Sequence, residues 1–573
     1  MKKIIKSILL LAAITTGLVS FVSCSDDDDL AKADALFRPI ISETDNIEQG
    51  LDDNLVPYVI VKWDNYTSAN QYTVKMEATD GSDVKEITTS DLTCRFDNLQ
   101  YDKEYFVYIS SANTNTGLTS KPYSLSITTI DYPTNLSSVA ATDIIDNAAR
   151  IRWSENGDYD LLKVYKDSND SLVHEVTVTS DMQAVRAAIV DGLQPRTTYR
   201  VEAFKNNVYK GKKRFTTAAA ENFSGAVIDL RSVVDSVGKT YITTDQMAAD
   251  VAEYAGQDLT YVLKGGFDYK ISGGTALPST ANKTKFVSGL TLEGNARFVQ
   301  TGGFTMASGA EINDVVFEKI DFVSDKVNNG SNPVETNHDK GWGGRQVFNV
   351  NGTKATMESL TYKNCSFTGY RAVCRAQSDN DAVHNITMED CLINCIGDQG
   401  VITTTNKKAD WRSVTMKNCT ITNIVMLCDL RSTAGTLNFS ITDCTFCYAP
   451  IETTANANTP MFRLGTGNVA LTVKNTLFGP SMASTDSGGG DVHCFKAGVA
   501  GSIFVSGTFD NLVVEDSYKT NFTWTDRGTD EPMINPLEGL TEAGMSETEL
   551  WKDPTKGDFT VIGKIKGGDA RWQ

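Results

Sequence analysis

The sequence predicts an all-β protein: two antiparallel β-sandwiches, followed by a solenoid of stacked coils that begins with a short helix. Three observations predict this order. Short alternating apolar runs recur at roughly ten-residue intervals in two successive segments, as antiparallel sandwiches require. An eight-residue pattern then recurs through the second half of the chain, which is typical of a solenoid. The gaps between its copies lack the helical periodicity that a barrel or doubly wound fold would need.

Length and charge limit the possible functions. The chain has 573 residues, several times a typical domain, so we expect several modules rather than one core. Its 53 Lys and Arg residues stand against 72 Asp and Glu residues, a net charge of −19. This balance argues against wholesale binding to nucleic acid or to an anionic membrane surface, and an acidic ligand would need a local basic patch.

Residues 1–23 have the composition of an export signal. Lys2, Lys3 and Lys6 precede an apolar run over residues 8–22, which is too short to be a stable membrane span. The run ends just before Cys24, and the residues around this point resemble a bacterial lipobox. The resemblance implies a signal peptide that is cut before Cys24, whose thiol then carries lipid.

Residues 24–35 form an acidic linker. Ser25 and the four aspartates after it resemble the export signal of Bacteroidetes-type lipoproteins, which implies a lipoprotein of the cell outer membrane that faces the exterior. The alternative is a solvated acidic linker on a lipoprotein that faces the periplasm. In both cases the lipid on Cys24 is the expected anchor, since no other segment is apolar and long enough to span.

Residues 36–130 and 131–219 repeat one layout. In each segment an early strand ends in a tryptophan and a late strand contains a tyrosine; these residues are Trp63 and Tyr105, then Trp153 and Tyr199. Both segments resemble fibronectin type III domains, which implies that the tryptophans fill the cores and that the tyrosines form tyrosine corners. The alternative is that the tryptophans are surface platforms for sugars, but their alternating strands favour the core. We interpret both modules as spacers.

A short amphipathic helix is predicted over residues 244–254. Residues 243–246 fit a capping box, and Met247, Val251 and Tyr254 follow at helical spacing. We expect this helix to cap the first coil of the solenoid, which would otherwise present unpaired strand edges.

Residues 225–535 carry the recurring pattern, which is the strongest signal in the sequence. Apolar residues alternate with Thr and charged residues, and an Asn or Asp usually precedes a Cys or Thr. The six copies are residues 315–322, 360–367, 386–393, 414–421, 439–446 and 471–478. The pattern resembles the right-handed parallel β-helix of the pectate-lyase-like superfamily, which implies coils about 4.8 Å apart. Residues 536–573 would be a C-terminal cap that packs Trp572 over the last coil.

Nine of the eleven cysteines fall in the predicted β-helix. Four occupy one position of the pattern, so we expect an inward column of free thiols; they are Cys365, Cys391, Cys419 and Cys444. Cys374 and Cys428 suggest a second column. Disulfides in an exported chain, or half a metal site over residues 444–447, are the alternatives. The regular spacing favours stacked thiols.

A second strand follows the pattern in several coils and places polar residues directly after its apolar ones. If the apolar residues point inward, the next residues share an outer face; they are Asn349, Arg375, Asp429, Arg463 and Lys496. Three further arginines lie close by in sequence, Arg345, Arg371 and Arg431, and a loop containing Trp342 could overhang them. This face could bind the carboxylates of an acidic polysaccharide, with Trp342 stacking on a sugar ring. The alternative is that its arginines and aspartates merely pair with one another on a solvated sheet.

The superfamily resemblance also implies candidates for catalysis. Uronide elimination needs a base, usually Arg or Lys in this superfamily, and a cation that neutralises the substrate carboxylate. Arg375 or Arg463 could be the base, and Asp398 or Asp429 could hold Ca²⁺. The sequence lacks the dense acidic cluster of the family's calcium site and the acidic motifs of polygalacturonases.

The whole mature chain resembles Bacteroidetes-type surface lipoproteins that combine fibronectin-like modules with a pectate-lyase-like helix. Such proteins are typically encoded among polysaccharide-utilisation systems. The resemblance implies a protein that binds a plant-type, acidic, pectin-like polysaccharide and works with outer-membrane glycan-import proteins. The alternatives are a polysaccharide lyase or other carbohydrate-active enzyme, and a surface adhesin.

Overall fold

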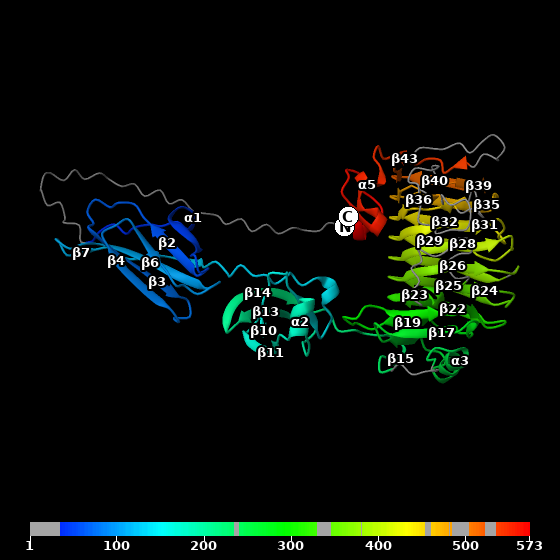
Figure 1. The fold of residues 1–573 in the computed structure, drawn as a ribbon, viewed down its shortest axis with the longest axis horizontal. Helices are drawn as coiled ribbons and strands as arrows, with labels where there is room; N and C mark the ends of the chain where they lie inside the picture. Colours follow the sequence, from blue (N-terminus) through cyan, green and yellow to red (C-terminus); the bar gives the residue numbers. More distant parts are fainter. Residues whose placement is uncertain are drawn as a thin grey trace, which may run out of the picture. The chain divides into compact units, whose positions relative to one another are not determined.

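The computed structural model describes residues 35–233, 240–328, 345–379, 381–452, 460–480, 482–483, 504–521 and 535–573. This part of the chain forms two antiparallel β-sandwiches and a parallel β-helix (Figure 1), which confirms the predicted all-β fold class. Within the same ranges, no helix combines the length and the apolar character needed to cross a membrane.

The first sandwich consists of a three-stranded and a five-stranded sheet. Its elements are α1 (Glu43–Asn46), β1 (Ile47–Leu51), β2 (Pro57–Lys62), β3 (Gln71–Ala78), β4 (Val84–Thr89), β5 (Thr93–Phe96), β6 (Glu104–Asn113), β7 (Leu118–Thr119) and β8 (Tyr123–Thr128). Trp63 is buried in its core. The Tyr105 hydroxyl accepts a hydrogen bond from the Gln100 amide at 3.1 Å and donates to Asp83 at 2.8 Å. These contacts confirm the predicted tyrosine corner.

The second sandwich pairs a two-stranded with a four-stranded sheet. Its elements are the 3₁₀ turn η1 (Ala141–Asp143), β9 (Ala149–Arg152), β10 (Leu161–Lys166), β11 (Ser171–Thr177), α2 (Ser180–Val185), β12 (Ala187–Val190), β13 (Thr198–Lys205) and β14 (Val208–Thr216). Trp153 is buried, and the Tyr199 hydroxyl accepts from the Gln194 amide at 2.8 Å. In both sandwiches, therefore, the tyrosine hydroxyl accepts a hydrogen bond from the backbone amide five residues earlier.

The β-helix is built from coils that contribute strands to two long sheets. One is a sheet of ten parallel strands, β15 (Ala226–Leu230), β16 (Leu259–Leu263), β19 (Thr284–Ser288), β22 (Glu311–Glu318), β25 (Thr356–Lys363), β27 (Ala382–Glu389), β29 (Ser413–Lys417), β32 (Leu437–Thr442), β36 (Val469–Lys474) and β40 (Asn511–Glu515). Its inward side chains belong to one continuous apolar core.

The other sheet has seventeen strands, arranged as two adjacent ladders. The first ladder contains β17 (Asp268–Ile271), β20 (Ala296–Gln300), β23 (Ile320–Ser324), the starts of β26 (Ser366–Ala376) and β28 (Leu392–Thr405), β30 (Thr420–Ile424), β33 (Thr445–Cys447), β37 (Leu477–Phe478), β41 (Tyr518–Lys519) and β43 (Thr541–Glu542). The second contains β18 (Thr275–Leu277), β21 (Phe304–Met306), β24 (Gln346–Val350), the ends of β26 and β28, β31 (Cys428–Leu430), β35 (Phe462–Thr466), β39 (Phe504–Thr508) and β42 (Asn535–Pro536). The remaining short elements are α4 (Asp325–Asn328), β34 (Ile451–Glu452) and β38 (Met482–Ala483).

The turn from the ten-stranded sheet to the first ladder explains the polar residue of the repeat. Its backbone is left-handed, with φ between 46° and 56° at Asn364, Asp390, Asn418, Asp443, Asn475 and Asp516. Asn and Asp adopt this conformation more readily than other residues with side chains. The two types alternate from coil to coil, and the Asn418 and Asn475 amides donate to Asp390 and Asp443. Each interleaved amide keeps successive carboxylates apart.

The residue after each of these turns forms the predicted inward column. Cys365, Cys391, Cys419 and Cys444 are 0–2% exposed, and Thr476 and Ser517 continue the column. Each thiol donates to the carbonyl two residues earlier at 3.2–3.4 Å, and both hydroxyls do so at 2.8 Å. From Cys365 onward the column therefore consists of small side chains with a hydrogen to donate, whereas the first copy of the pattern has Ile320 there, after Lys319.

The predicted second column of thiols is interrupted. Cys374 and Cys428 are buried, but Ile402 lies between them in the ladder. The nine described cysteines are all free thiols. Cys444 belongs to the β-helix core whereas Cys447 belongs to a separate cluster outside it, so the two do not form half a metal site.

We expect alkaline pH to destabilise the β-helix through its buried thiols. Burial raises the pKa of Cys365 to about 12, whereas an unfolded thiol ionises near 8.5. The unfolded chain therefore loses protons first as pH rises, and stability falls above pH 8.5. At pH 10 this one thiol should cost about 2 kcal/mol. Urea unfolding of wild type and Cys365→Ser at pH 7.5 and 10 measures this contribution to the free energy of unfolding, because serine does not ionise. Equal losses of stability between the two pH values in both proteins would contradict the prediction.

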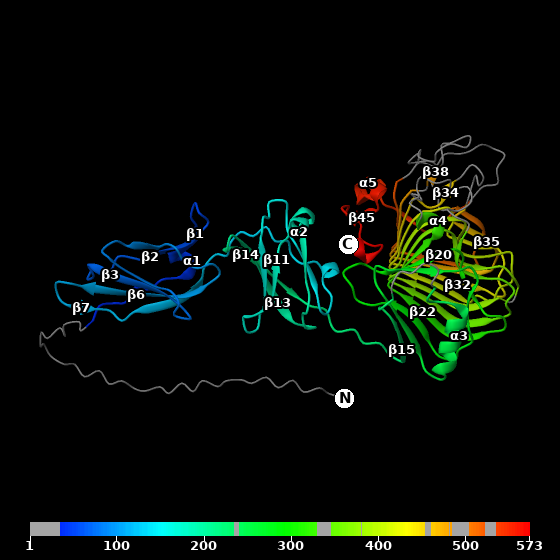
Figure 2. The ribbon, with the colours of Figure 1, turned by 60° about the horizontal axis from the view of Figure 1, so that its bottom comes forward.

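Helix α3 (Thr244–Glu253) lies at the end of the β-helix where β15 begins, as Figure 2 shows. The Thr243 hydroxyl accepts from the Gln246 amide at 3.2 Å, which confirms the N-cap, and Met247 packs into the core. The Gln246 side chain does not complete the predicted capping box. It donates instead to the buried carboxylate of Asp250 at 2.9 Å, which also accepts from Tyr261 at 2.7 Å.

The C-terminal segment begins on the last coil, where β42 and β43 join the ladders and Leu537 packs into the core. The remainder of the segment turns back, so the prediction that Trp572 packs over the last coil is wrong. This remainder contains α5 (Glu547–Leu550), β44 (Trp551–Asp553), η3 (Pro554–Lys556), β45 (Asp558–Val561) and η4 (Ala570–Trp572). The Trp572 indole donates to Thr420 on β30 at 2.7 Å, in an inner coil. The segment is held on the side of the helix because apolar side chains face outward there, namely Val425, Cys447 and Leu477, and they pack with Leu550, Trp551 and Phe559.

Candidate functional site

One ladder of the seventeen-stranded sheet brings together most of the residues that the sequence nominated. Asn349, Arg375, Thr403, Asp429 and Arg463 pair in this order on successive strands. Thr403 occupies a rung that the sequence pattern skipped. The next rung pairs Arg463 with Ser506. Lys496 and Trp342 lie outside the described residues.

Arg345, Arg371 and Arg431 flank this ladder, as expected from their positions in the chain. We call the five arginines Arg345, Arg371, Arg375, Arg431 and Arg463 the arginine stripe. Two of them form single ion pairs: Arg345 with Asp325, at 3.1 Å, and Arg371 with Asp398, at 2.7 and 2.9 Å. No pattern in the sequence singles out Asp325, which begins α4 directly after β23.

Asp429 lies beneath two arginines. Its carboxylate is 5% exposed and accepts from Arg431 at 2.8 and 3.0 Å, while the Arg463 guanidinium is 3.6 Å away. Asp398 and Asp429, the two candidate Ca²⁺ ligands, thus both face guanidinium groups. No cluster of three His, Cys, Asp or Glu side chains in the described ranges is arranged to hold a metal ion.

Arg375 differs from its neighbours because no carboxylate of the described residues pairs with it. With the Gln377 amide oriented to suit its neighbours, its oxygen accepts from the Arg375 guanidinium at 2.9 and 3.0 Å, and its nitrogen donates to Asn349. Burial, and then the nearby charge of Arg371, lower the pKa of Arg375 from its usual value. Arg375 is therefore a half-buried cation that forms no ion pair in this part of the chain, because Asp398, the carboxylate whose charge reaches it, is held by Arg371.

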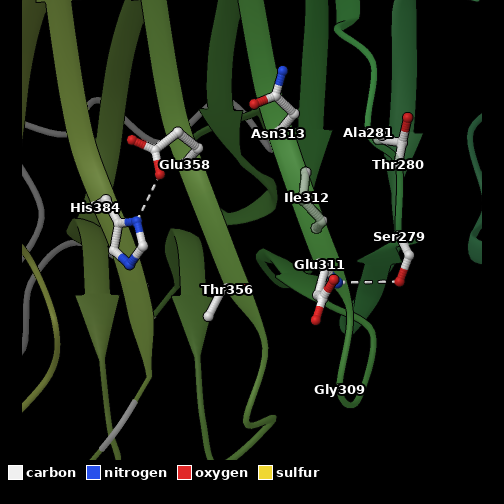
Figure 3. A pocket seen from close by; sticks show the side chains of 10 residues that line it. All are labelled: Ser279, Thr280, Ala281, Gly309, Glu311, Ile312, Asn313, Thr356, Glu358 and His384. Atoms are coloured by element: carbon white, nitrogen blue, oxygen red, sulfur yellow. Dashed lines mark hydrogen bonds and ion pairs between the residues drawn. The ribbon is translucent and has the colours of Figure 1, made fainter.

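A cavity of about 630 Å³ lies on the outer face of the ten-stranded sheet (Figure 3). Glu358 on β25 and His384 on β27 point toward each other there, with the His384 Nδ1 2.8 Å from the Glu358 carboxylate. The other ring nitrogen is 3.2 Å from Asp410, which pairs with Arg412 at 2.7 Å. This group was not among the predicted site residues. The spacing of Glu358 and His384, one coil of 26 residues, was the available signal.

The chemistry of this second group is structural. The hydrogen bond from His384 lowers the pKa of Glu358, and Arg412, more than His384, lowers the pKa of Asp410. The Nδ1 atom is engaged by Glu358, and the Nε2 atom is buried beside Asp410 without a hydrogen bond among the described residues, so neither nitrogen is exposed to a substrate. The group ties three successive coils together at the edge of the sheet.

Comparisons with known proteins add little to this geometry. No family model matches the chain, and no curated protein matches it. Among solved structures, a segment of two fibronectin type III domains from chicken tenascin is 16% identical over 30% of this chain and all of that one, with a TM-score of 0.16. The first three such domains of chicken CNTN1 are 13% identical over 32% of this chain and 68% of that one, with a TM-score of 0.15.

Proposed function

We propose that this protein is a surface lipoprotein of the outer membrane, anchored through Cys24, whose β-helix binds an acidic, pectin-like polysaccharide along the arginine stripe. The observation that carries the proposal is Arg375, a half-buried cation that forms no ion pair among the described residues. A buried charge without a partner is costly, and an anionic ligand would supply that partner.

The charge balance of the stripe supports an acidic ligand. Among the residues that the structure describes, its five arginines meet three aspartates, Asp325, Asp398 and Asp429, on a chain whose net charge is −19. A local positive surplus is what an acidic ligand needs on an acidic protein. Guanidinium groups also match the geometry of carboxylates, because they donate two parallel hydrogen bonds.

The direction of the stripe supports a linear polymer. Its residues lie on successive strands, which in a parallel sheet are about 4.8 Å apart. A polysaccharide chain that runs along the helix axis would meet one rung after another. In this proposal the two sandwiches are spacers, and partner proteins of the outer membrane import the captured glycan.

A lyase is the second candidate, and the lowered pKa of Arg375 favours it. An arginine that acts as a base must lose a proton, which burial and a neighbouring cation make easier. Asp398 and Asp429 would have to exchange their arginines for Ca²⁺ before they could help to neutralise a substrate carboxylate. Binding without cleavage requires no such exchange.

We expect Arg375→Gln to weaken binding of polygalacturonate about tenfold, or 1.4 kcal/mol. The measurement is calorimetric titration of the chain without residues 1–24, with fully methyl-esterified pectin as the uncharged comparison. Arg297→Gln is the matched control, since Arg297 pairs with Asp268 on the first ladder of the same β-helix. No saturable binding to any acidic glycan, or an equal loss in both variants, would contradict the proposal.

The same samples distinguish the lyase. Elimination produces unsaturated oligosaccharides, whose absorbance rises with time, with or without added Ca²⁺. We expect no such rise for a binding protein. A rise that Arg375→Gln abolishes would establish catalysis and replace binding as the function.

A further inference from the structure

The arginines of the stripe are not electrostatically equal. Arg345 and Arg371 each have an aspartate of their own, and Arg431 holds both oxygens of Asp429. Their charges are neutralised one to one. A ligand that bound to any of these three would have to compete with a carboxylate already in place.

The charges of the other two arginines are not neutralised by an aspartate of their own among the described residues. Within the described ranges, Arg375 hydrogen-bonds to the Gln377 amide and forms no ion pair, and Arg463 lies 3.6 Å from a carboxylate that Arg431 already holds. The Arg463 side chain is also 32% exposed, so part of it faces solvent. The positive surplus of the stripe is therefore concentrated at these two points.

The strand register sets the distance between the two points. Arg375 pairs with Thr403, Thr403 with Asp429, and Asp429 with Arg463, which makes a separation of three rungs. At about 4.8 Å per rung the two cations are about 14 Å apart along the helix axis.

The two rungs between them add no positive charge. Thr403 is fully buried, and its hydroxyl donates to the Asp429 carbonyl at 3.3 Å. The Asp429 carboxylate is neutralised by Arg431. A ligand crosses these rungs without meeting a free cation.

We propose that the stripe recognises two acidic groups about 14 Å apart on one linear glycan, with uncharged units between them. This inference rests on the proposed function and narrows its ligand to a sparsely charged acidic glycan, such as a partly esterified uronate chain, rather than a dense polyanion. Bridging two cations makes the second contact intramolecular, so affinity rises once the ligand is long enough to span them.

The test is the affinity of wild type, Arg375→Gln and Arg463→Gln for uronate oligomers of increasing length. An oligomer too short to bridge the two arginines can bind at either one, so each variant should bind it at most about twofold more weakly than wild type. Either variant should bind oligomers that span three rungs about tenfold more weakly than wild type. Arg297→Gln should bind oligomers of every length as tightly as wild type does. Matched unfolding curves of all variants show that the fold is kept.

The outcomes separate the two proposals. If no acidic oligomer of any length binds, the proposed function fails and this inference fails with it. If oligomers bind but the loss of affinity in Arg463→Gln does not change with oligomer length, the proposed binding of an acidic glycan stands. The inference that Arg375 and Arg463 recognise two acidic groups together is then overturned. A partly esterified chain that binds more weakly than the fully charged chain of equal length would also overturn it.

Discussion

Phe317→Ala should destabilise the β-helix by about 3–5 kcal/mol, the cost of removing a fully buried aromatic ring. Phe317 is 0% exposed and lies between Phe286 and Tyr362, with ring centroids 5.1 and 5.4 Å away and nearly parallel planes. Phe322 meets its edge at 5.4 Å. The loss removes the middle of a stack that joins three successive coils, so neighbouring rings cannot close the cavity.

Urea unfolding, followed by the fluorescence of buried Trp411, measures this loss in the β-helix itself. Leu392→Ala is the control, because Leu392 lies on an outer face of the same helix and is 39% exposed. We expect the control to cost under about 1 kcal/mol. Equal losses in the two variants would show that the stack contributes no more than surface packing.

Trp551→Ala should detach the C-terminal segment from the side of the β-helix while the coils stay folded. Trp551 is 0% exposed, and its ring meets that of Phe559 edge to face at 5.5 Å. Truncation of a buried tryptophan costs about 3–5 kcal/mol, which is large for a segment of about thirty residues held by one small cluster. Limited proteolysis should then cut within residues 545–573 much faster than in wild type.

A second variant tests the same contact from the other side. A Cβ on Gly479 would lie 2.7 Å from the Cys447 sulfur and 2.9 Å from the Trp551 ring, so Gly479→Ala should also loosen the segment. Trp551→Phe, which keeps most of the ring, should be cut more slowly than Trp551→Ala. The Thr420 hydroxyl also donates to Asp569 at 2.6 Å. Unchanged cleavage in both alanine variants would mean that the contacts of Asp569 and Trp572 with Thr420 hold the segment without this cluster.

The features that sequence could predict are those set within one coil or one turn. The Asn or Asp of each turn and the small residue after it repeat because every coil solves the same local problem, namely a left-handed turn followed by a buried, hydrogen-bonded position. The tyrosine corners follow from a contact over five residues. Such short-range constraints leave a regular trace in the chain.

The features that it missed depend on contacts between distant segments. The sequence could not place Thr403 and Ser506 in the ladder because the loops between coils vary in length. The position of a residue in one strand therefore cannot be counted from the strand of the previous coil. The docking of Trp572 on β30 joins residues 152 positions apart. The pairing of Arg345 with Asp325 likewise joins residues 20 positions apart, next to strands of different ladders.

The alternation of Asn and Asp along the turns has a consequence for how such a chain can change in length. Losing a coil that carries Asn would set two aspartates on neighbouring rungs, about 4.8 Å apart, where they repel. Losing a coil that carries Asp would set two asparagines side by side, which can still hydrogen-bond. Deletion of residues 392–419, the unit that ends in the Asn418 turn and Cys419, should therefore be tolerated less well than deletion of residues 366–391, which ends in the Asp390 turn and Cys391. Loss of an adjacent pair of coils keeps the alternation of Asn and Asp intact. This β-helix should therefore gain or lose coils most easily in even numbers.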